Sequence, residues 1–292
     1  MPTLDFERLR SIRATSPGLV SELLRQRARR PLLRESGRLF IVAADHPARG
    51  ALGVGPNESA MADRYDLLER LVLAISRPGV DGVLGTPDII EDLAILGALD
   101  DKVVVGSMNR GGLKSAVFEM DDRFTSYDVP SMVEAGIDFA KLLIRINLSD
   151  AGSAASIEAT ARAVDAAVAA RLPIMLEPFM SEWVDGAIRN DLTTDAVVKS
   201  VAIASALGTS SAYSWLKLPV VADMERVMAA TTLPTLLLGG DQMSNQEETY
   251  SSWEAALTLP GVRGLVVGRT LLYPPGGDVS AAVDTASALV HS

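Results

Sequence analysis

Five charged side chains interrupt or end aliphatic segments, where charge is costly. Lys217 and Lys141 lie inside such segments, and they are two of only five lysines in the chain. Glu177 ends another segment, and Asp45 and Arg269 each follow one. Because an unpaired buried charge costs several kcal/mol, these positions together favour a functional site over a set of unrelated structural ion pairs.

Lys217 has the features of an amine nucleophile. A free lysine is protonated, with a pKa of about 10.4, but burial among apolar strands and a second nearby ammonium both lower that value. Lys141 is the candidate for the second ammonium. A neutral Lys217 can attack a ketone or an aldehyde, and the protonated imine that forms accepts electrons, so that a neighbouring C–C bond can break. Glu177 and Asp45 are the candidate acids or bases for the proton transfers.

Each of these charges also has a purely structural explanation. A single lysine at a strand end is more often the partner of an acid than a nucleophile, and Glu177 or Asp45 could pair with Lys141 in a buried network. Arg269, which follows Gly268, could be a surface residue after a tight turn. The sequence leaves these alternatives open.

Glycines after two aliphatic segments predict a phosphate-binding site. One segment ends in Leu-Gly-Gly-Asp and the other in Val-Gly-Arg. The loops after the seventh and eighth strands of barrels often bind phosphate through glycine N–H groups, and an arginine adds a charge-assisted hydrogen bond. The expected substrate- and phosphate-binding residues are Arg145, Gly239, Gly240, Gly268, Arg269 and His46. We expect no metal and no cofactor, because the chain has only two histidines and a single imidazole makes a poor catalytic metal site.

The order of the segments predicts a (β/α)8 barrel. Short aliphatic runs alternate with Ala- and Leu-rich runs of helical periodicity, and eight strands that are each followed by a crossover indicate a closed parallel barrel. The expected strands are Leu39–Ala44, Gly82–Leu84 with its flanks, Val103–Ser107, Phe139–Ile146, Ile174–Glu177, Tyr213–Leu218, Thr235–Leu238 and Leu265–Val267. The expected helices include Ala60–Ile75, Ser153–Ala170, Thr194–Ala206, Gln246–Leu257 and Val279–Val290. We expect one domain over residues 1–292, with an N-terminal helical extension at 1–37 and the barrel at 38–292.

The alternation of side chains along each strand places the charges inside this barrel. Successive side chains of a strand point to opposite faces, so Tyr213, Trp215 and Lys217 share one face. The inward sets on other strands are Lys141, Leu143, Arg145 and Asn147; Met175, Glu177 and Phe179; and Ile41, Ala43 and Asp45. The charged members lie near the C-terminal ends of their strands, where barrel enzymes build their active sites.

An open doubly wound sheet is the alternative fold. Such a sheet should carry a G-x-G-x-x-G turn after its first strand, but the segment after Ala44 reads DHPARGALGVG, which has other glycine spacing. The long irregular stretch from Met108 to Pro130 is expected to form a lid or loop over the barrel mouth.

Composition limits the classes of partner. The net charge of −10 and the pI near 4.8 argue against nucleic acid. The basic stretch from Arg25 to Arg34 is interpreted as a solvated face or a subunit contact, and a homo-oligomer is expected.

The chain has no cysteine, which excludes disulfides, thiolate zinc sites and a cysteine nucleophile. The charged N-terminus and the lack of an apolar run of about 18 residues predict a cytoplasmic protein without a membrane partner.

The sequence resembles the class I aldolase superfamily, and within it most closely the tagatose-1,6-bisphosphate aldolase branch beside deoxyribose-phosphate aldolases. The segments that carry the resemblance are LKLP at Lys217, AKLLI at Lys141, PIMLEPF at Glu177, ADH at Asp45 and VVGR at Arg269. The resemblance implies a (β/α)8 fold and a bacterial lyase of carbohydrate metabolism. Such an enzyme makes or breaks a C–C bond of a phosphorylated sugar or keto-sugar acid through a lysine Schiff base.

One departure from that family concerns the residues after the Asp-His pair. Many relatives have glycine there, whereas this chain has Pro47-Ala48-Arg49-Gly50, which leaves the substrate open. Two alternative functions also remain: a non-catalytic sugar-phosphate sensor on the same barrel, and a barrel isomerase or epimerase that uses Glu177 and Asp45 as acid and base.

Overall fold

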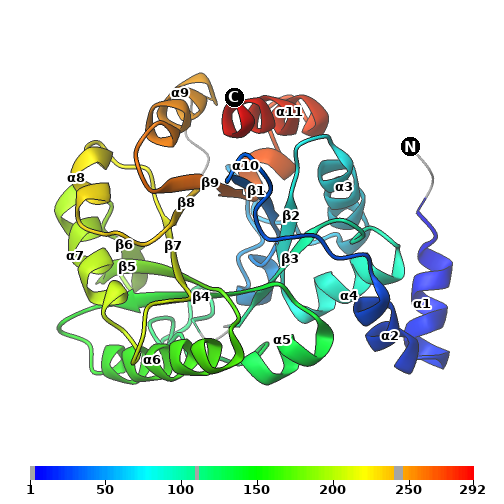
Figure 1. The fold of residues 1–292 in the computed structure, drawn as a ribbon, viewed down its shortest axis with the longest axis horizontal. Helices are drawn as coiled ribbons and strands as arrows, with labels where there is room; N and C mark the ends of the chain where they lie inside the picture. The colour runs from blue at the N-terminus through cyan, green and yellow to red at the C-terminus, as the bar shows by residue number, and fades with distance from the viewer. Residues whose placement is uncertain (1–3, 109–111, 240–245) are drawn as a thin grey trace.

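The computed structural model describes residues 4–108, 112–239 and 246–292 and shows a closed barrel of parallel strands surrounded by helices (Figure 1). Eight strands form the barrel in the order β1-β2-β3-β4-β5-β7-β8-β9, and β9 pairs in parallel with β1 to close it. Their bounds are β1 Leu39–Ala43, β2 Gly82–Gly85, β3 Val103–Ser107, β4 Phe139–Ile146, β5 Ile174–Val184, β7 Ser214–Leu218, β8 Thr235–Leu238 and β9 Val262–Val267. The expected (β/α)8 barrel is therefore confirmed.

Helices follow the strands and pack around the barrel (Figure 1). Their bounds are α1 Phe6–Thr15, α2 Gly18–Gln26, α3 Arg64–Ser76, α4 Pro87–Ile95, α5 Val129–Ala135, α6 Gly152–Ala170, α7 Thr194–Ser205, α8 Met224–Ala229, α9 Gln246–Leu257, α10 Arg269–Leu272 and α11 Val279–His291, with a 3-10 turn η1 at Pro47–Arg49. The helix expected from Ala60 begins at Arg64, because the carboxylate of Asp63 accepts hydrogen bonds from the free N–H groups of its first turn. No helix in the described part of the chain has the length and apolarity to cross a bilayer.

A β-hairpin extends the fifth barrel strand beyond its expected end at Glu177. The outer half of β5 pairs antiparallel with β6, Ala187–Asn190. Asp185 and Gly186 join the two strands, and both have positive φ, as a type I′ turn requires. The Asp-Gly pair is the sequence signal for this hairpin, although the expected strands did not include it.

Apolar side chains fill the interior of the barrel away from the C-terminal ends of its strands. The inward cluster includes Phe139 and Trp215, whose rings meet edge to face at 5.4 Å. Leu32 and Leu33, from the segment after α2, pack against this cluster. This inward cluster is formed by aliphatic and aromatic side chains.

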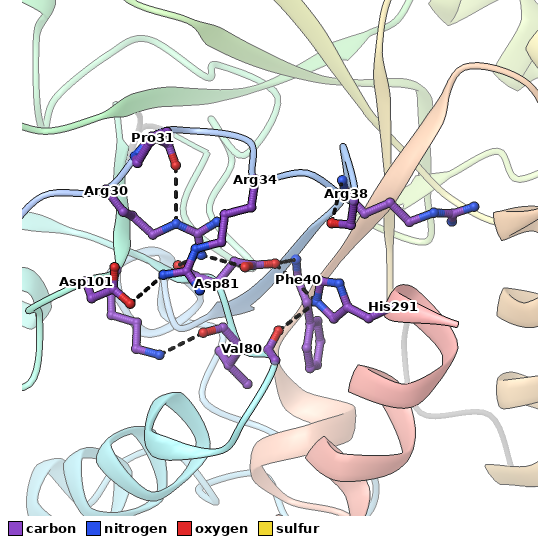
Figure 2. Close-up of polar contacts among 12 residues, drawn as sticks. Arg30, Pro31, Arg34, Arg38, Phe40, Val80, Asp81, Asp101 and His291 are labelled. Carbon is purple, nitrogen blue, oxygen red and sulfur yellow. Dashed lines mark hydrogen bonds and ion pairs between the residues drawn. The ribbon is translucent and has the colours of Figure 1, made fainter.

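Buried ion pairs attach the N-terminal segment to the bottom of the barrel (Figure 2). Arg30 Nη1 lies 2.5 Å from Asp81 Oδ1, and the other carboxylate oxygen accepts the backbone N–H of Phe40 at 2.8 Å. Arg27, also buried, pairs with Asp138 at 2.7 Å. The interpretation of the basic stretch as a solvated face was therefore wrong for these two arginines, because aspartates at the strand entrances neutralise them.

Candidate active site

A cavity of about 460 Å³ opens at the C-terminal end of the barrel. The sequence-predicted residues that line it are His46, Arg145, Glu177, Lys217, Gly239, Gly268 and Arg269. Lys141 and Asp45 are buried, and Lys141 connects Asp45 to this group because it forms ion pairs with both Asp45 and Glu177. Gly240 lies outside the described residues. The structure thus gathers in one place nine of the ten residues singled out from sequence.

Lys217 is held inside the barrel by β7. The strand pairs with β5 and β8, and Pro219, which has no N–H to donate, follows its last residue. The alternation predicted for this strand places Lys217 on the same inward face as Trp215. Lys217 is only 4% exposed, and its Nζ lies 2.9 Å from Oε1 of Glu177 on β5. Lys217 therefore lines the cavity, and its amine contacts a carboxylate.

A second buried lysine completes a chain of alternating charges. Nζ of Lys141 lies 2.8 Å from Oδ2 of Asp45 and 2.7 Å from Oε2 of Glu177. The hydroxyl of Ser107 donates to the same Asp45 oxygen at 3.2 Å. Glu177 thus bridges the two amines. Lys141 is 1% exposed and is not among the residues that line the cavity. For Lys141, the structural explanation given above, a buried network with Glu177 or Asp45, is therefore correct.

The surroundings move the pKa values of the two lysines in opposite directions. Burial lowers the pKa of Lys217, and the nearby Lys141 ammonium lowers it further, against the opposing effect of Glu177. Burial also disfavours charged Lys141, but Asp45 and Glu177 outweigh it and raise its pKa. Groups with pKa values driven apart in this way are suited to different roles. Lys217 is the amine that can be neutral, and Lys141 is a fixed cation.

The two carboxylates are ionised at rest. Burial alone would raise the pKa of Glu177, but Lys141 and Lys217 lower it to about 2. Burial opposes ionisation of Asp45 too, and Lys141 with neighbouring cations still holds its pKa well below the usual value. Glu177, which lines the cavity, is therefore in the base form and within reach of the Lys217 amine.

His46 is neutral beside this network. Its Nδ1 lies 3.8 Å from Asp45 Oδ1, and burial, the largest effect, lowers its pKa to about 3 against the attraction of that carboxylate. Its ring packs next to Gly268, where a Cβ atom would lie 3.1 Å from His46 Cε1 and 2.4 Å from the carbonyl oxygen of Ala43. Glycine is thus required at 268 by the close approach of β9 to the end of β1.

The expected phosphate-binding end of the cavity lies at β8 and β9. Gly239 follows β8, Gly268 and Arg269 follow β9, and all three line the cavity. Thr249 and Ser252 of α9 line it too. Sequence reasoning missed these two hydroxyls, because a serine and a threonine in a polar helix give no signal of their own.

The segment after β3 covers the end of β4. Nη1 of Arg145 donates to the carbonyl of Glu119 at 2.6 Å, and the backbone N–H of Arg145 donates to Asp122 Oδ2 at 3.2 Å. Burial raises the pKa of Asp122 to about 6. Glu119 and Asp122 of the expected lid or loop therefore contact Arg145; residues 109–111 are outside the described part.

Arg49 also lines the cavity. In the sequence it was noted only as one of the four residues after the Asp-His pair that differ from the class I aldolase relatives. It ends the 3-10 turn η1 directly after the Asp-His pair.

Within the described residues, no group of three or more His, Cys, Asp or Glu side chains is arranged to hold a metal ion.

Comparisons with known proteins relate this chain to one protein family and to solved barrel structures. A family model described as Cgl0159-like matches residues 37–287. The crystal structure of Cgl0159 from Corynebacterium glutamicum (Brevibacterium flavum) shares 68% sequence identity, covers 100% of this chain and 99% of its own, and gives a TM-score of 0.97. No functionally curated protein matches the sequence.

More distant solved structures include aldolases. A Schiff base-forming fructose-1,6-bisphosphate aldolase is 22% identical, covers 93% of this chain and 99% of its own, and has a TM-score of 0.65. An archaeal fructose-1,6-bisphosphate aldolase, solved with its catalytic lysine bound to the carbinolamine intermediate, is 22% identical over 94% of this chain and 100% of its own, with a TM-score of 0.66. At this identity the likeness concerns the fold.

Proposed function

The chain belongs to the Cgl0159-like protein family, and we propose that it is a metal-independent class I aldolase that forms a Schiff base on Lys217. One observation carries the proposal: Lys217 lines the cavity, and its amine, with its pKa lowered by burial, lies 2.9 Å from an ionised carboxylate. A plain structural ion pair needs no cavity above the amine.

The proposed reaction starts with attack of neutral Lys217 Nζ on the substrate carbonyl carbon. The carbinolamine loses water to give a protonated imine. A base takes the proton of the hydroxyl on the carbon beyond the scissile bond, that bond breaks, and its electron pair moves into the imine to leave an enamine and a free aldehyde. The enamine carbon then takes up a proton, and water hydrolyses the imine and releases the amine. Glu177, ionised and in contact with the amine, is the proposed acid and base for these transfers.

Lys141 and Asp45 support this chemistry in our proposal. Lys141 remains a cation between two acids, so it disfavours a proton on Lys217. Gly239, Gly268 and Arg269 are proposed to hold a phosphate of a sugar or keto-sugar acid, because the backbone of a glycine and a guanidinium both donate to phosphate oxygens. The tagatose-bisphosphate branch remains a prediction from resemblance.

Reductive trapping tests the proposed function. The protein is incubated with dihydroxyacetone phosphate and a panel of ketose phosphates, treated with borohydride, digested and mapped by mass spectrometry. We expect a stable adduct on Lys217 that is absent in Lys217→Ala. Lys199→Ala is the matched control, because Lys199 is an exposed lysine on α7, and it should be trapped like the wild type. Binding of a sugar phosphate without any adduct would favour the sensor, and turnover that borohydride does not inhibit would favour the isomerase.

A further inference from the structure

The β5–β6 hairpin has no part in the proposed chemistry, but it forms one wall of the cavity. Asn190, the last residue of β6, and Leu192, two residues further along the chain, both line the cavity. Leu192 is 52% exposed although it is apolar. Ligand cavities typically combine apolar side chains with a few polar groups that fix the orientation of the ligand, so these two residues together indicate a contact with the substrate.

The inward alternation of β5 continues into the hairpin. Glu177 and Phe179 line the cavity, and Ser181, two residues further, has the same parity and is 6% exposed. Ser181 lies opposite Asn190 in the antiparallel register. Because directly opposite residues of two paired strands project from the same face, the side chain of Asn190 faces the cavity.

A hydrogen bond with Ser181 fixes the orientation of the Asn190 amide. The hydroxyl of Ser181 donates to Oδ1 of Asn190 at 2.8 Å. The carbonyl oxygen of the amide is therefore occupied, and Nδ2 makes no hydrogen bond among the described residues. Since an amide nitrogen carries two donor hydrogens, Nδ2 can donate to an oxygen atom of a molecule in the cavity.

Contacts on both of its strands hold the hairpin in place. The backbone N–H of Asp191 donates to the carbonyl of Met180 at 2.8 Å. Nε1 of Trp183 donates to Oδ2 of Asp150 at 2.9 Å, and Oδ1 of Asp150 accepts the N–H of Gly152, the first residue of α6, at 2.8 Å. The hairpin is thereby attached to the loop between β4 and α6. A donor on such a fixed element can select among substrates.

The charges of the hairpin disfavour an anion at this wall. Residues 181–191 include three acids, Glu182, Asp185 and Asp191, and one arginine, Arg189. Glu182 and Arg189 lie opposite each other in the register, which leaves the hairpin with an excess of negative charge. Because juxtaposed like charges repel, the oxygen atom that fits Asn190 is that of a neutral group, such as a hydroxyl.

The order of the strands relates this wall to the two halves of the substrate. Lys217 is on β7, which lies between β5 and β8. The glycines and the arginine proposed to hold a phosphate follow β8 and β9, whereas the hairpin extends β5 on the other side of the amine. Ser181 is four residues beyond Glu177, or about 13 Å along the strand, so the hairpin is placed to meet the end of the substrate and not the reacting carbons.

We infer that Asn190 is a specificity-determining residue, whose amide donates a hydrogen bond to a neutral hydroxyl oxygen in the half of the substrate that leaves as the aldehyde. This inference rests on the proposed aldolase function. Ser181 acts through Asn190 and is a positioning residue, and Leu192 covers the carbon chain. A site with a donor for a substrate hydroxyl discriminates against the analogue that lacks this hydroxyl, because the donor then loses its partner.

The test uses the condensation direction with dihydroxyacetone phosphate as the donor and pairs of aldehydes that differ by one hydroxyl. The enamine carbon on Lys217 attacks the aldehyde carbon, the aldehyde oxygen takes up a proton, and hydrolysis of the imine releases the product. The pairs are D-glyceraldehyde with D-lactaldehyde, and D-erythrose with 4-deoxy-D-erythrose. In at least one pair we expect the hydroxylated aldehyde to have the higher kcat/KM by about two- to tenfold, the range of one neutral hydrogen bond.

Substitution of Asn190 should remove this preference. In Asn190→Ala we expect the ratio of kcat/KM for the hydroxylated and the deoxy aldehyde to fall by about two- to tenfold. Ser181→Ala should lose part of the preference, and Ser181→Thr, which keeps a hydroxyl, should retain it. Gln26→Ala, which removes an exposed amide at the end of α2, should keep the wild-type ratio. A wild type that prefers neither hydroxylated aldehyde, or an unchanged ratio in Asn190→Ala, would overturn the inference.

A binding measurement separates failure of the inference from failure of the proposed function. Absence of any adduct on Lys217 defeats the aldolase, and the hydroxyl contact is then tested by calorimetric titration with ribitol 5-phosphate, which has no carbonyl and forms no imine. We expect Asn190→Ala to bind this polyol phosphate about two- to tenfold more weakly than the wild type, and Gln26→Ala to bind it like the wild type. Equal binding by Asn190→Ala and the wild type would overturn the contact as well.

Discussion

Nζ of Lys217 and Oε1 of Glu177 lie 2.9 Å apart inside the barrel, and the other oxygen of this carboxylate lies 2.7 Å from Nζ of Lys141. Two opposing influences therefore act on the protonation of Lys217. The charge of Glu177 stabilises the ammonium form of Lys217, while burial and Lys141 destabilise it. The sum of these effects leaves the pKa of Lys217 lowered. Substitutions of Glu177 and its neighbours should therefore change the protonation of Lys217 and the rate of bond cleavage to different extents.

Removal of the Lys217 amine should abolish turnover without unfolding the barrel. We expect Lys217→Met to lower kcat/KM by about four orders of magnitude or more, because no other group supplies the imine nitrogen. The acid that it leaves, Glu177, still contacts Lys141. Circular dichroism should therefore remain native-like, and steady-state kinetics on a substrate found by trapping should show no residual Schiff-base chemistry. Substantial retained activity would contradict the assignment of the nucleophile.

Loss of the Glu177 charge should separate imine formation from bond cleavage. In Glu177→Gln we expect kcat to fall by about 10²- to 10⁴-fold, the range for a lost general acid or base. Adduct formation should persist, and its pH dependence should move to lower pH, because Glu177 raises the pKa of Lys217. Borohydride trapping across a pH series measures this. A variant that forms no adduct at any pH would show that Glu177 has a different role.

Loss of Lys141 should destabilise the folded state. Lys141→Met leaves buried Asp45 without its closest cation and Glu177 with one instead of two, and breaking a buried pair in this way costs about 3–5 kcal/mol. Both carboxylates have lowered pKa values in the wild type, so their contribution to stability is present above their unfolded pKa values and is lost as the pH falls. Urea denaturation at pH 7 should reveal the loss, and exposed Lys199→Met should stay within about 0.5 kcal/mol of the wild type.

The ion pair of protonated His291 should contribute to stability at low pH and be lost as the pH rises. Its Nε2 lies 3.3 Å from Asp81 Oδ2 (Figure 2), and this carboxylate raises the pKa of the imidazole above its usual 6.5. The contribution is therefore fully present below pH 6.5 and is lost as the pH rises through the raised value. His291→Gln should lower Tm at pH 5.5 by at most about 2 °C, because the side chain is partly exposed, and the difference should be smaller at pH 9, where the hydrogen bond to the Gly79 carbonyl at 2.8 Å remains but the charge does not. Equal differences at both pH values would indicate a contact that does not depend on charge.

A side chain at position 268 should disturb the junction of β1 and β9. The Cβ of Gly268→Ala would lie 2.4 Å from the carbonyl oxygen of Ala43, so the backbone has to shift. We expect a destabilisation of about 1–3 kcal/mol together with a higher KM for phosphorylated substrates. Gly18→Ala on α2, where a Cβ meets no atom within 4 Å, is the control and should leave both quantities near wild type.

The barrel and the inward side of each strand could be predicted from sequence because both depend on local periodicity. Alternation along 213–218 places Lys217 and Trp215 on one face, and the structure has both inside. The hairpin beyond Glu177 was missed because the expected strand was ended at the first charged residue, although the Asp185-Gly186 turn was visible.

The partner of each charge was decided only by the closed barrel. Period two determines which face a side chain occupies, but the atoms that it meets across the interior depend on how far neighbouring strands are staggered when the sheet closes. For that reason the sequence identified Lys217, Lys141, Glu177 and Asp45, and the tertiary structure determined that Glu177 bridges both amines. Contacts with distant segments also determine that Arg27 and Arg30 are buried against aspartates. In the same way, only the tertiary structure shows that Arg49 lines the cavity and has no acidic partner among the described residues.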